Sequence, residues 1–517
     1  MSNTIVLGVL AMLVLTCAGA AAAPQPVQYD IAILGGRVID PEIGLDAIRN
    51  VGIRGDRIVA VTETAMTATT VIDASGRVVS PGFIDLHAHG QSVPAARMQA
   101  LDGVTTALEL EAGVLPVEDF YAQRAEQGRP INYGAAVNWA NARIAVLLDK
   151  SPQADASWFL QQFSNPAWQT QLATEAEVEQ MAALVQEGLD QGALGVGFLL
   201  GYAPGTGRKE YYRMTELAAR NGVPTFTHAR FLSMLEPDSS FEGMEEIIAA
   251  AAGTGVHAHI VHLNSISLRD IGIISSMIAG ARERGVRVTT EAYPYGAGST
   301  GIGAAMFRGP DWRERIGGVT AGSFDVDGER LSEDELARLQ REAPGTQTVL
   351  HFLDTANPRD QQLLDRAVLF PGGVIASDGG DWMVAGEPLP AATWPLPEGA
   401  WSHPRSAGTF ARFLRQYLRE QRSLSLLEAI ERISFGPAAI LQDSAPQLRQ
   451  KGRIQPGADA DIVVFDLARI TDNATYASPA RPSSGIDYVL VNGVVLVAEG
   501  ELDSEVMPGR PVRNELR

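Results

Sequence analysis

The chain has 517 residues, of which 45% are hydrophobic and 20% are charged. This composition is ordinary for a folded protein and excludes disorder over most of the chain, and the length allows about three domains or a large barrel with additions. The formal net charge of −20 would repel nucleic acid and anionic lipid surfaces. We therefore expect a small-molecule ligand and no nucleic-acid partner.

Residues 1–23 have the pattern of a secretory signal peptide. The apolar run at 5–15 is too short to span a bilayer comfortably, and the small residues that follow it predict cleavage near Ala20 to Ala23. Two alternatives stay open, namely acylation of Cys17, the only cysteine, and retention of the segment as an N-terminal anchor. Cleavage would leave no thiol and no membrane span. We expect a protein secreted across the inner membrane into the periplasm.

Both ends of the mature chain read as short β-strands separated by turns. Alternating apolar residues with Gly, Asp and Asn turns follow Tyr29, and the same texture returns in GRIQPGADADIVVFDL and IDYVLVNGVVLVAEGEL. Neither segment is long enough for a comfortable β-domain alone. We predict that residues 24–80 and 441–517 together form one small β-sandwich, with residues 81–440 inserted between them.

The middle of the chain alternates apolar strands with amphipathic helices that end near glycine. The eight predicted strands are 83–89, 104–111, 133–139, 193–200, 224–230, 257–264, 287–295 and 373–378. This alternation predicts a distorted (β/α)₈ TIM-like barrel, whose active site would lie at the carboxyl ends of the strands. Residues 300–350 break the rhythm and predict an insertion or lid.

The first two predicted strands carry candidate metal ligands. His87 and His89 are two residues apart, so they share one face of a strand, where a divalent metal or simple core packing could explain them. Glu109 and Glu111 also share a face, and two inward carboxylates are costly unless they are paired or metal-bound. Glu111 is nearer the strand end and is the preferred ligand, which leaves Glu109 as a supporting or ion-paired residue.

Three later strands add polar residues near their ends. The strand at 224–230 offers His228 as a ligand and Arg230, whose planar fork suits a substrate carboxylate or a structural ion pair. Tyr293 could hold an oxyanion or could pack as an aromatic residue. Asp378 could bind metal and accept a proton from water.

The strand at 257–264 contains three histidines. Strand parity places His257 and His259 on one face and His262 on the other, so all three cannot serve one site. His262 lies at the carboxyl end and is the ligand candidate. We expect His257 and His259 to be packing or helix-facing residues and assign no role to His351 or His403.

The motifs HAHG, THAR, VHLN, EAYPY, SDG and GRIQPGADADIVVFD together resemble the amidohydrolase superfamily, and within it the N-acyl-D-amino-acid deacylases, or D-aminoacylases. The resemblance runs from about Tyr29 to Arg513. It implies a distorted barrel with a small β-sandwich and one or two zinc ions. The ligands that it implies are His87, His89, His228, His262 and Asp378.

Three departures from that family are visible. The family's metal-binding cysteine is replaced by Ala112, so we expect Glu111 to supply the missing anion. Asn264 stands where many members have a lysine that contacts the substrate, which makes it a third substrate-binding candidate beside Arg230 and Tyr293. Gly90 replaces a common aspartate. None of the three lysines ends a predicted strand, and the changes resemble the D-glutamate deacylase branch.

The resemblance implies hydrolysis of N-acyl-D-amino acids, with N-acyl-D-glutamate as a candidate. Zinc would activate a water molecule, and Asp378 would accept its proton and pass it to the leaving amine. Two alternatives stay open. The same metal site could hydrolyse cyclic imides, dipeptides or lactones, or the chain could be a non-catalytic periplasmic binding protein. The sequence leaves the oligomeric state undetermined.

Overall fold

The structure is a computed structural model that describes Met1 and residues 28–516. The predicted signal peptide and Cys17 lie outside the described residues. Within the described part of the chain, no helix is both long enough and apolar enough to cross a membrane.

An eight-stranded parallel sheet curls into the predicted barrel. Its order is β17-β12-β11-β10-β9-β8-β7-β6. The strands are β6 (Phe83–Asp85), β7 (Val104–Val114), β8 (Asn132–Asn138), β9 (Val196–Leu199), β10 (Thr225–His228), β11 (Ala258–Ile260), β12 (Val288–Ala292) and β17 (Val374–Ile375). The two end strands approach each other because Asp378 N donates to His87 O at 2.7 Å, and Ala88 bridges Gly379. Burial on both faces explains the nearly continuous apolar runs in these strands.

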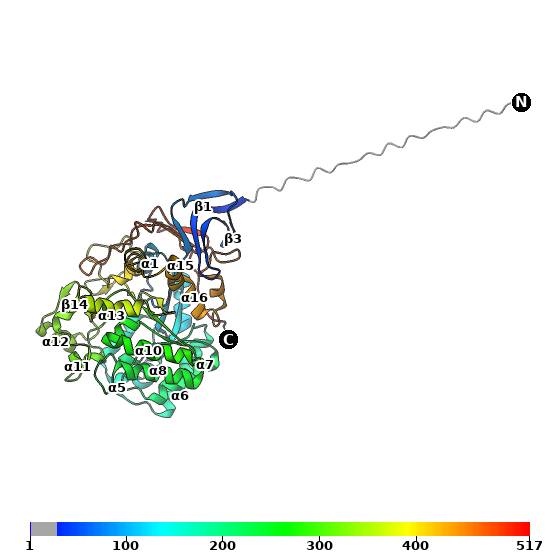
Figure 1. Cartoon of the computed structure of the whole chain (residues 1–517). Coiled ribbons are helices and arrows are strands. Elements are labelled where there is room, and N and C mark those ends of the chain that lie inside the picture. Colours follow the sequence, from blue (N-terminus) through cyan, green and yellow to red (C-terminus); the bar gives the residue numbers. More distant parts are fainter. Residues whose placement is uncertain (2–27, 517) are drawn as a thin grey trace.

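Helices cover the outside of the barrel, and Figure 1 shows several of them packed together on one side. The main ones are α1 (Val93–Leu101), α2 (Val117–Gln127), α3 (Trp139–Leu148), α6 (Glu175–Asp190), α7 (Arg208–Asn221), α8 (Ser240–Thr254), α10 (Ile271–Glu283), α13 (Pro358–Val368) and α14 (Arg405–Phe413). Helices α6 and α8 begin with capping boxes, Thr174 with Glu177 and Ser239 with Glu242. Each box satisfies helix-end N–H groups, which fixes where the helix starts.

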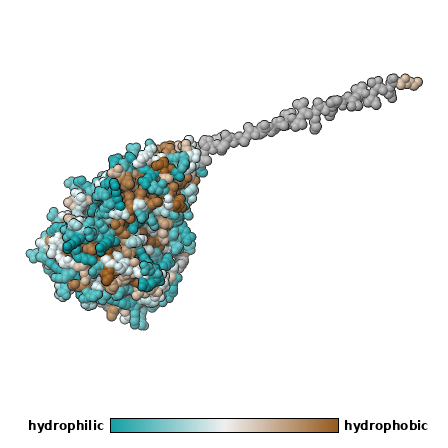
Figure 2. Space-filling view, viewed as in Figure 1, coloured by the Kyte–Doolittle hydropathy of each residue, from teal (hydrophilic) through white to brown (hydrophobic). Residues whose placement is uncertain are grey.

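Strands from the two ends of the chain join in one nine-stranded sheet, which agrees with the expectation that the two ends come together. From the first end come β1 (Gln28–Asp40), β2 (Leu45–Arg54), β3 (Arg57–Thr62), β4 (Thr67–Asp73) and β5 (Val78–Pro81), and from the second β20 (Ile462–Phe465), β21 (Ile486–Val491), β22 (Val494–Ala498) and β23 (Glu501–Leu502). Antiparallel pairing of β5 with β20 joins the two groups of strands. The sheet has its own apolar core, which includes Val51, Ile58 and Val464. Apolar side chains also reach the surface at this end of the molecule (Figure 2). The exact domain boundaries stay a prediction.

An anchor of buried polar groups ties this sheet to the barrel. Lys451 Nζ lies 2.6 Å from Asp461 Oδ2 and 2.8 Å from Asp459 Oδ2, and Asn132 of β8 donates to Asp461 at 3.0 Å. Asn492 N also donates to Asp461, at 2.6 Å. The two aspartates of the GADAD motif therefore serve as structural contacts between the sheet and the barrel.

Residues between β12 and α13 form a separate four-stranded sheet. Its strands are β13 (Ala297–Gly301), β14 (Phe324–Val326), β15 (Glu329–Arg330) and β16 (Gln347–His351), with α11 (Trp312–Arg315) and α12 (Glu333–Glu342) between them. Tyr202, which follows β9, is hydrogen-bonded to Thr300 of β13 at 2.8 Å. This contact holds the inserted sheet against the carboxyl end of the barrel, and a lid function stays a prediction.

Candidate metal centre

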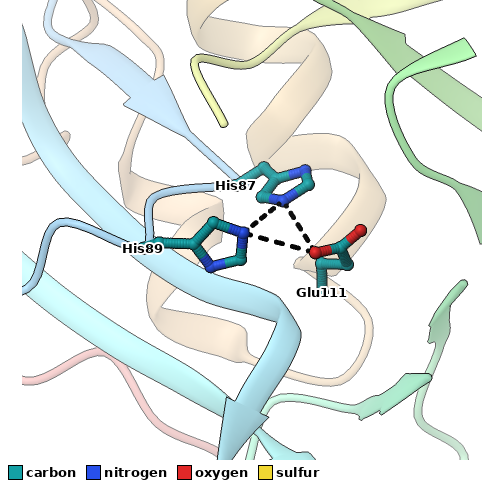
Figure 3. A group of neighbouring side chains, drawn as sticks. All are labelled: His87, His89 and Glu111. Carbon is teal, nitrogen blue, oxygen red and sulfur yellow. Dashed lines mark hydrogen bonds and ion pairs between the residues drawn. The ribbon is translucent and has the colours of Figure 1, made fainter. Parts of the chain in front are cut away.

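Glu111 lies between two pairs of histidines near the end of β7. Its Oε1 atom is 2.9 Å from His228 Nδ1 and 2.8 Å from His262 Nε2. Its Oε2 atom is 3.2 Å from His87 Nε2 and 3.3 Å from His89 Nε2, a convergence that Figure 3 shows. The side chain is buried, so each carboxylate oxygen faces one imidazole pair without competition from bulk solvent.

Asp378 completes the first histidine pair. Its Oδ1 atom lies 3.4 Å from the Nε2 atoms of both His87 and His89, which are themselves 3.1 Å apart. The sequence spacing had suggested that these histidines lie within a strand. Strand β6 ends at Asp85, so they lie just beyond it. The predicted ligands nevertheless converge.

Two residues of the cluster have strained backbones. His262 has φ of 29° and Asp378 has φ of 52°, in a region that non-glycine residues seldom occupy. In a regular strand, His262 would point to the face opposite His259. The turn at His262 follows β11 directly, and it lets the His262 side chain reach Glu111. Such strain is typical of sites where side-chain geometry outweighs backbone preference.

The donor set fits one or two divalent metal ions. The groups His87–His89–Glu111 and Glu111–His228–His262 each bring their ligand atoms within 4.8 Å of one another. Imidazole and carboxylate donors in this number suit zinc and related metals, and a shared carboxylate can bridge two ions. Buried carboxylates and imidazoles facing one another at 2.8–3.4 Å are the arrangement that a metal would stabilise.

Electrostatics hold the cluster together. Burial by itself lowers the pKa of His87, but the surrounding carboxylates, led by Asp378, outweigh burial and place this pKa well above its ordinary value. Burial raises the pKa of Glu111, but the facing imidazoles, led by His87, outweigh it and lower the pKa well below its usual range. A cation bound beside these carboxylates would take over the stabilising role of a proton on His87, so metal uptake at this position would favour release of that proton.

Further residues orient the ligands from behind. His87 Nδ1 lies 2.5 Å from Glu291 Oε1, and His89 Nδ1 lies 2.9 Å from Glu109 Oε2. Glu109 is therefore a supporting residue, the role that the sequence left open for it. Glu291 was missed, although its place in EAYPY at the end of a barrel strand was a usable signal.

His259 packs against Phe226 and also meets a carboxylate that the sequence did not indicate. This residue is fully buried in the barrel, and its Nε2 atom lies 3.1 Å from Glu291 Oε2. The parity argument placed His259 and His262 on opposite faces, but the chain leaves the strand conformation after Ile260. His262 therefore meets Glu111 directly, and His259 is linked to His87 through Glu291.

Arg230 does not offer a free fork to a substrate, which corrects the sequence-based expectation. Its Nε and Nη2 atoms bind Glu246 at 2.8 and 2.6 Å, and Nη1 donates to the carbonyl oxygens of Thr206 and Pro204. The guanidinium is fully buried in these contacts. The alternative of a structural ion pair is the one that the structure supports.

Arg405, which the sequence analysis missed, takes the place next to the metal cluster. Its Nη2 atom lies 2.7 Å from Asp378 Oδ1, and its guanidinium lies 4.6 Å from the centroid of the Tyr293 ring. Neither Nε nor Nη1 has a hydrogen-bond partner among the described residues. A buried arginine with unsatisfied N–H groups can donate a charge-assisted hydrogen bond to a carboxylate. The HPR sequence at 403–405 was its only signal.

Asn264 and Tyr293 are coupled through the backbone. Asn264 Nδ2 donates to Tyr295 O at 3.2 Å, and its Oδ1 accepts from Tyr293 N at 3.4 Å. Asn264 therefore holds the backbone around Tyr293 and Tyr295, and its contact with a substrate stays a prediction. Burial raises the pKa of the Tyr293 phenol, so its hydroxyl stays a proton donor at neutral pH.

Comparison with known proteins agrees with this geometry. Residues 70–497 match the Amidohydrolase family. An N-acyl-D-aspartate deacylase of Alcaligenes xylosoxydans xylosoxydans is 29% identical over 526 residues, which cover 94% of this chain and 95% of the relative. An N-acyl-D-glutamate deacylase of the same organism is 27% identical over 533 residues, which cover 94% of this chain and 97% of the relative.

A solved structure extends the likeness to three dimensions. N-acyl-D-glutamate deacylase from Bordetella bronchiseptica, complexed with zinc and a phosphonate inhibitor that mimics the tetrahedral intermediate, matches with a TM-score of 0.75 and 27% identity. The alignment covers 94% of this chain and all of that one. These matches confirm the resemblance to D-aminoacylases that the motifs indicated. With a family match over most of its length, the chain belongs to the amidohydrolase family of enzymes.

Proposed function

We propose that this enzyme is a zinc-dependent deacylase of N-acyl-D-amino acids, with acidic side chains such as D-glutamate as the first candidates. The observation that carries the proposal is Glu111, whose two oxygens each face a histidine pair. The acidic preference is supported by the relatives named for N-acyl-D-glutamate and N-acyl-D-aspartate.

His87, His89, Glu111, His228, His262 and Asp378 would hold the zinc. Zinc held there would supply an acidified water molecule and would polarise the amide carbonyl. Asp378 accepts the proton of the attacking water and then donates it to the leaving amine. Tyr293 donates its hydroxyl proton in a hydrogen bond to the oxygen that becomes negatively charged.

Arg405 is the proposed anchor for the substrate's α-carboxylate. Its Nη1 atom, which has no hydrogen-bond partner among the described residues, provides the donor, while Nη2 remains on Asp378. This arrangement would place the carboxylate beside the proton-accepting residue. It also explains how a chain with Asn264 in place of the family's lysine still supplies a cation for an acidic substrate.

The test is hydrolysis of paired N-acetyl-D- and N-acetyl-L-amino acids by the zinc-loaded protein, with detection of the free amine. Hydrolysis confined to the D series, with glutamate or aspartate preferred, is expected. No hydrolysis across the panel at stoichiometric zinc would overturn the substrate class and favour imides, dipeptides or lactones. If the protein bound no zinc at all, a non-catalytic binding protein would be favoured instead.

We also propose periplasmic location, on the strength of residues 1–23. The N-terminal sequence of the protein recovered from its native host tests this proposal. Cleavage near Ala20 to Ala23 is the expected result. An intact N-terminus or a lipid on Cys17 would replace it with one of the two alternatives.

A further inference from the structure

We infer that Glu291 and His259 form a buried positioning relay that fixes the ring of His87 and thereby sets the affinity of the metal centre. The inference rests on the proposed function, since it concerns metal binding. It assigns a role to two residues, one from β11 and one from β12, that do not themselves reach the metal.

The contacts run in an unbroken line through the barrel interior. Glu291 Oε1 lies 2.5 Å from His87 Nδ1, and Glu291 Oε2 lies 3.1 Å from His259 Nε2. His259 Nδ1 lies 2.8 Å from Thr289 Oγ1, and His257 Nε2 lies 2.9 Å from the same oxygen. The Glu291 side chain is 1% exposed and the side chains of His87 and His259 are equally inaccessible.

The Glu291 carboxylate determines the direction of every hydrogen bond in this line. Glu291 as a carboxylate only accepts hydrogen bonds, so His87 donates from Nδ1 and His259 donates from Nε2. With its ring proton on Nε2, His259 accepts at Nδ1, and Thr289 donates its single hydroxyl proton there. Thr289 in turn accepts from His257 Nε2. This assignment leaves the Nε2 lone pair of His87 free and directed at the metal cluster.

Solvent cannot take over the role of Glu291. The His89 side chain is 29% exposed, so water could replace Glu109 behind it, whereas the His87 side chain is 1% exposed. A buried N–H group without an acceptor is destabilised by roughly 1–3 kcal/mol. The two supporting carboxylates are therefore unequal, and Glu291 is the one that the metal centre depends on more.

A single substitution separates charge from shape. In Glu291→Gln, one oxygen remains to accept a hydrogen bond while two imidazoles present donors, so one ring must turn or change tautomer. Loss of such a partner behind a metal-bound histidine typically weakens metal binding about 10–100-fold. Glu291→Asp keeps the charge but is shorter, and we expect it to recover part of the affinity.

The experiment measures zinc dissociation constants of the metal-free full chain by competition with a chromogenic chelator. Glu291→Gln is expected to bind zinc about 10–100-fold more weakly at the His87 site. His259→Phe should weaken binding less, because Glu291 still holds His87. The control is Glu210→Gln, which alters a carboxylate of equal burial that pairs with Arg143 away from the cluster. Its zinc affinity should match that of the unsubstituted protein.

A second readout separates positioning from a general loss of structure. The absorption spectrum of the cobalt-substituted protein reports ligand geometry, and it should change in Glu291→Gln but not in Glu210→Gln. Equal zinc affinity and equal spectra in Glu291→Gln and the unsubstituted protein would overturn the inference. Absence of zinc binding in the unsubstituted protein would instead overturn the proposed function. If Glu291→Gln does not fold, Glu291→Asp and His259→Phe decide by the same two measurements.

Discussion

Arg405 Nη2 lies 2.7 Å from Asp378 Oδ1, and both residues are buried beside the histidine cluster. Asp378 thus has a cation on one side and two imidazoles on the other. Burial by itself raises the pKa of Asp378, but Arg405 and His87 outweigh it and lower the pKa below its usual value. This residue therefore stays ionised and ready to accept a proton.

Replacing Asp378 by asparagine should separate metal binding from turnover. Asparagine retains an oxygen at the position of Oδ1, so zinc content should stay close to that of the unsubstituted protein. It cannot accept the proton of the attacking water, and loss of such a general base typically lowers the rate by about 10²–10⁴-fold. Zinc analysis together with kcat measures both effects, and near-normal turnover would refute the proton-transfer role.

Replacing Arg405 by methionine should change both substrate affinity and pH dependence. We expect a raised KM, because the proposed partner of the substrate carboxylate is lost. Arg405 lowers the pKa of Asp378, so its removal raises that pKa. The acidic limb of the kcat/KM profile should then move to higher pH. An unchanged profile with a raised KM would leave carboxylate binding as its only role, and Arg230→Met serves as the comparison at a structural ion pair.

Replacing Glu111 by alanine should remove metal from both histidine pairs. Each of its oxygens faces one pair, so the loss should exceed that of a terminal ligand. Stoichiometry measured by atomic emission on the purified protein tests this expectation. Glu109→Ala is the matched control, since it contacts His89 from behind and should lower affinity rather than stoichiometry. If Glu109→Ala lost more zinc than Glu111→Ala, then Glu109 would be the ligand and Glu111 the supporting residue.

Replacing Lys451 by methionine should destabilise the junction between the sheet and the barrel. The change leaves Asp459 and Asp461 without their buried cation, and breaking a buried pair in this way costs about 3–5 kcal/mol. Denaturant unfolding measures the loss, with the exposed Lys209→Met as control. A loss no larger than that of the control would show that Asn132 and Asn492 suffice to hold Asp461.

The pH dependence of this junction has a definite sign. Burial by itself lowers the pKa of Lys451, but Asp461 and Asp459 outweigh it, so the folded state has a raised pKa. The stabilisation is present below the ordinary lysine pKa of about 10.4 and is lost as the pH rises through the raised value. In Lys451→Met, the difference in unfolding free energy from the unsubstituted protein should therefore shrink only in that alkaline range.

The sequence alone determined the barrel, the sheet built from both chain ends and the candidate ligands. Apolar runs indicate buried strands, and capping residues indicate where helices begin. Both signals are contained in short stretches of the sequence. His87, His89, Glu111, His228, His262 and Asp378 were identifiable because parallel barrel strands bring their carboxyl ends to one rim. The alignment of each side chain with a particular oxygen of Glu111 was beyond that reasoning.

Only the tertiary structure decided which polar residues serve the site. Arg230 ends a predicted barrel strand and Arg405 does not. In the structure, however, Glu246 and two carbonyl groups bind Arg230, while two nitrogens of Arg405 have no hydrogen-bond partner among the described residues. His259 reaches His87 only through Glu291, on a neighbouring strand. Hydrogen-bond satisfaction depends on partners distant in the chain, and sequence periodicity reports the face of a residue but not the partner that it meets there.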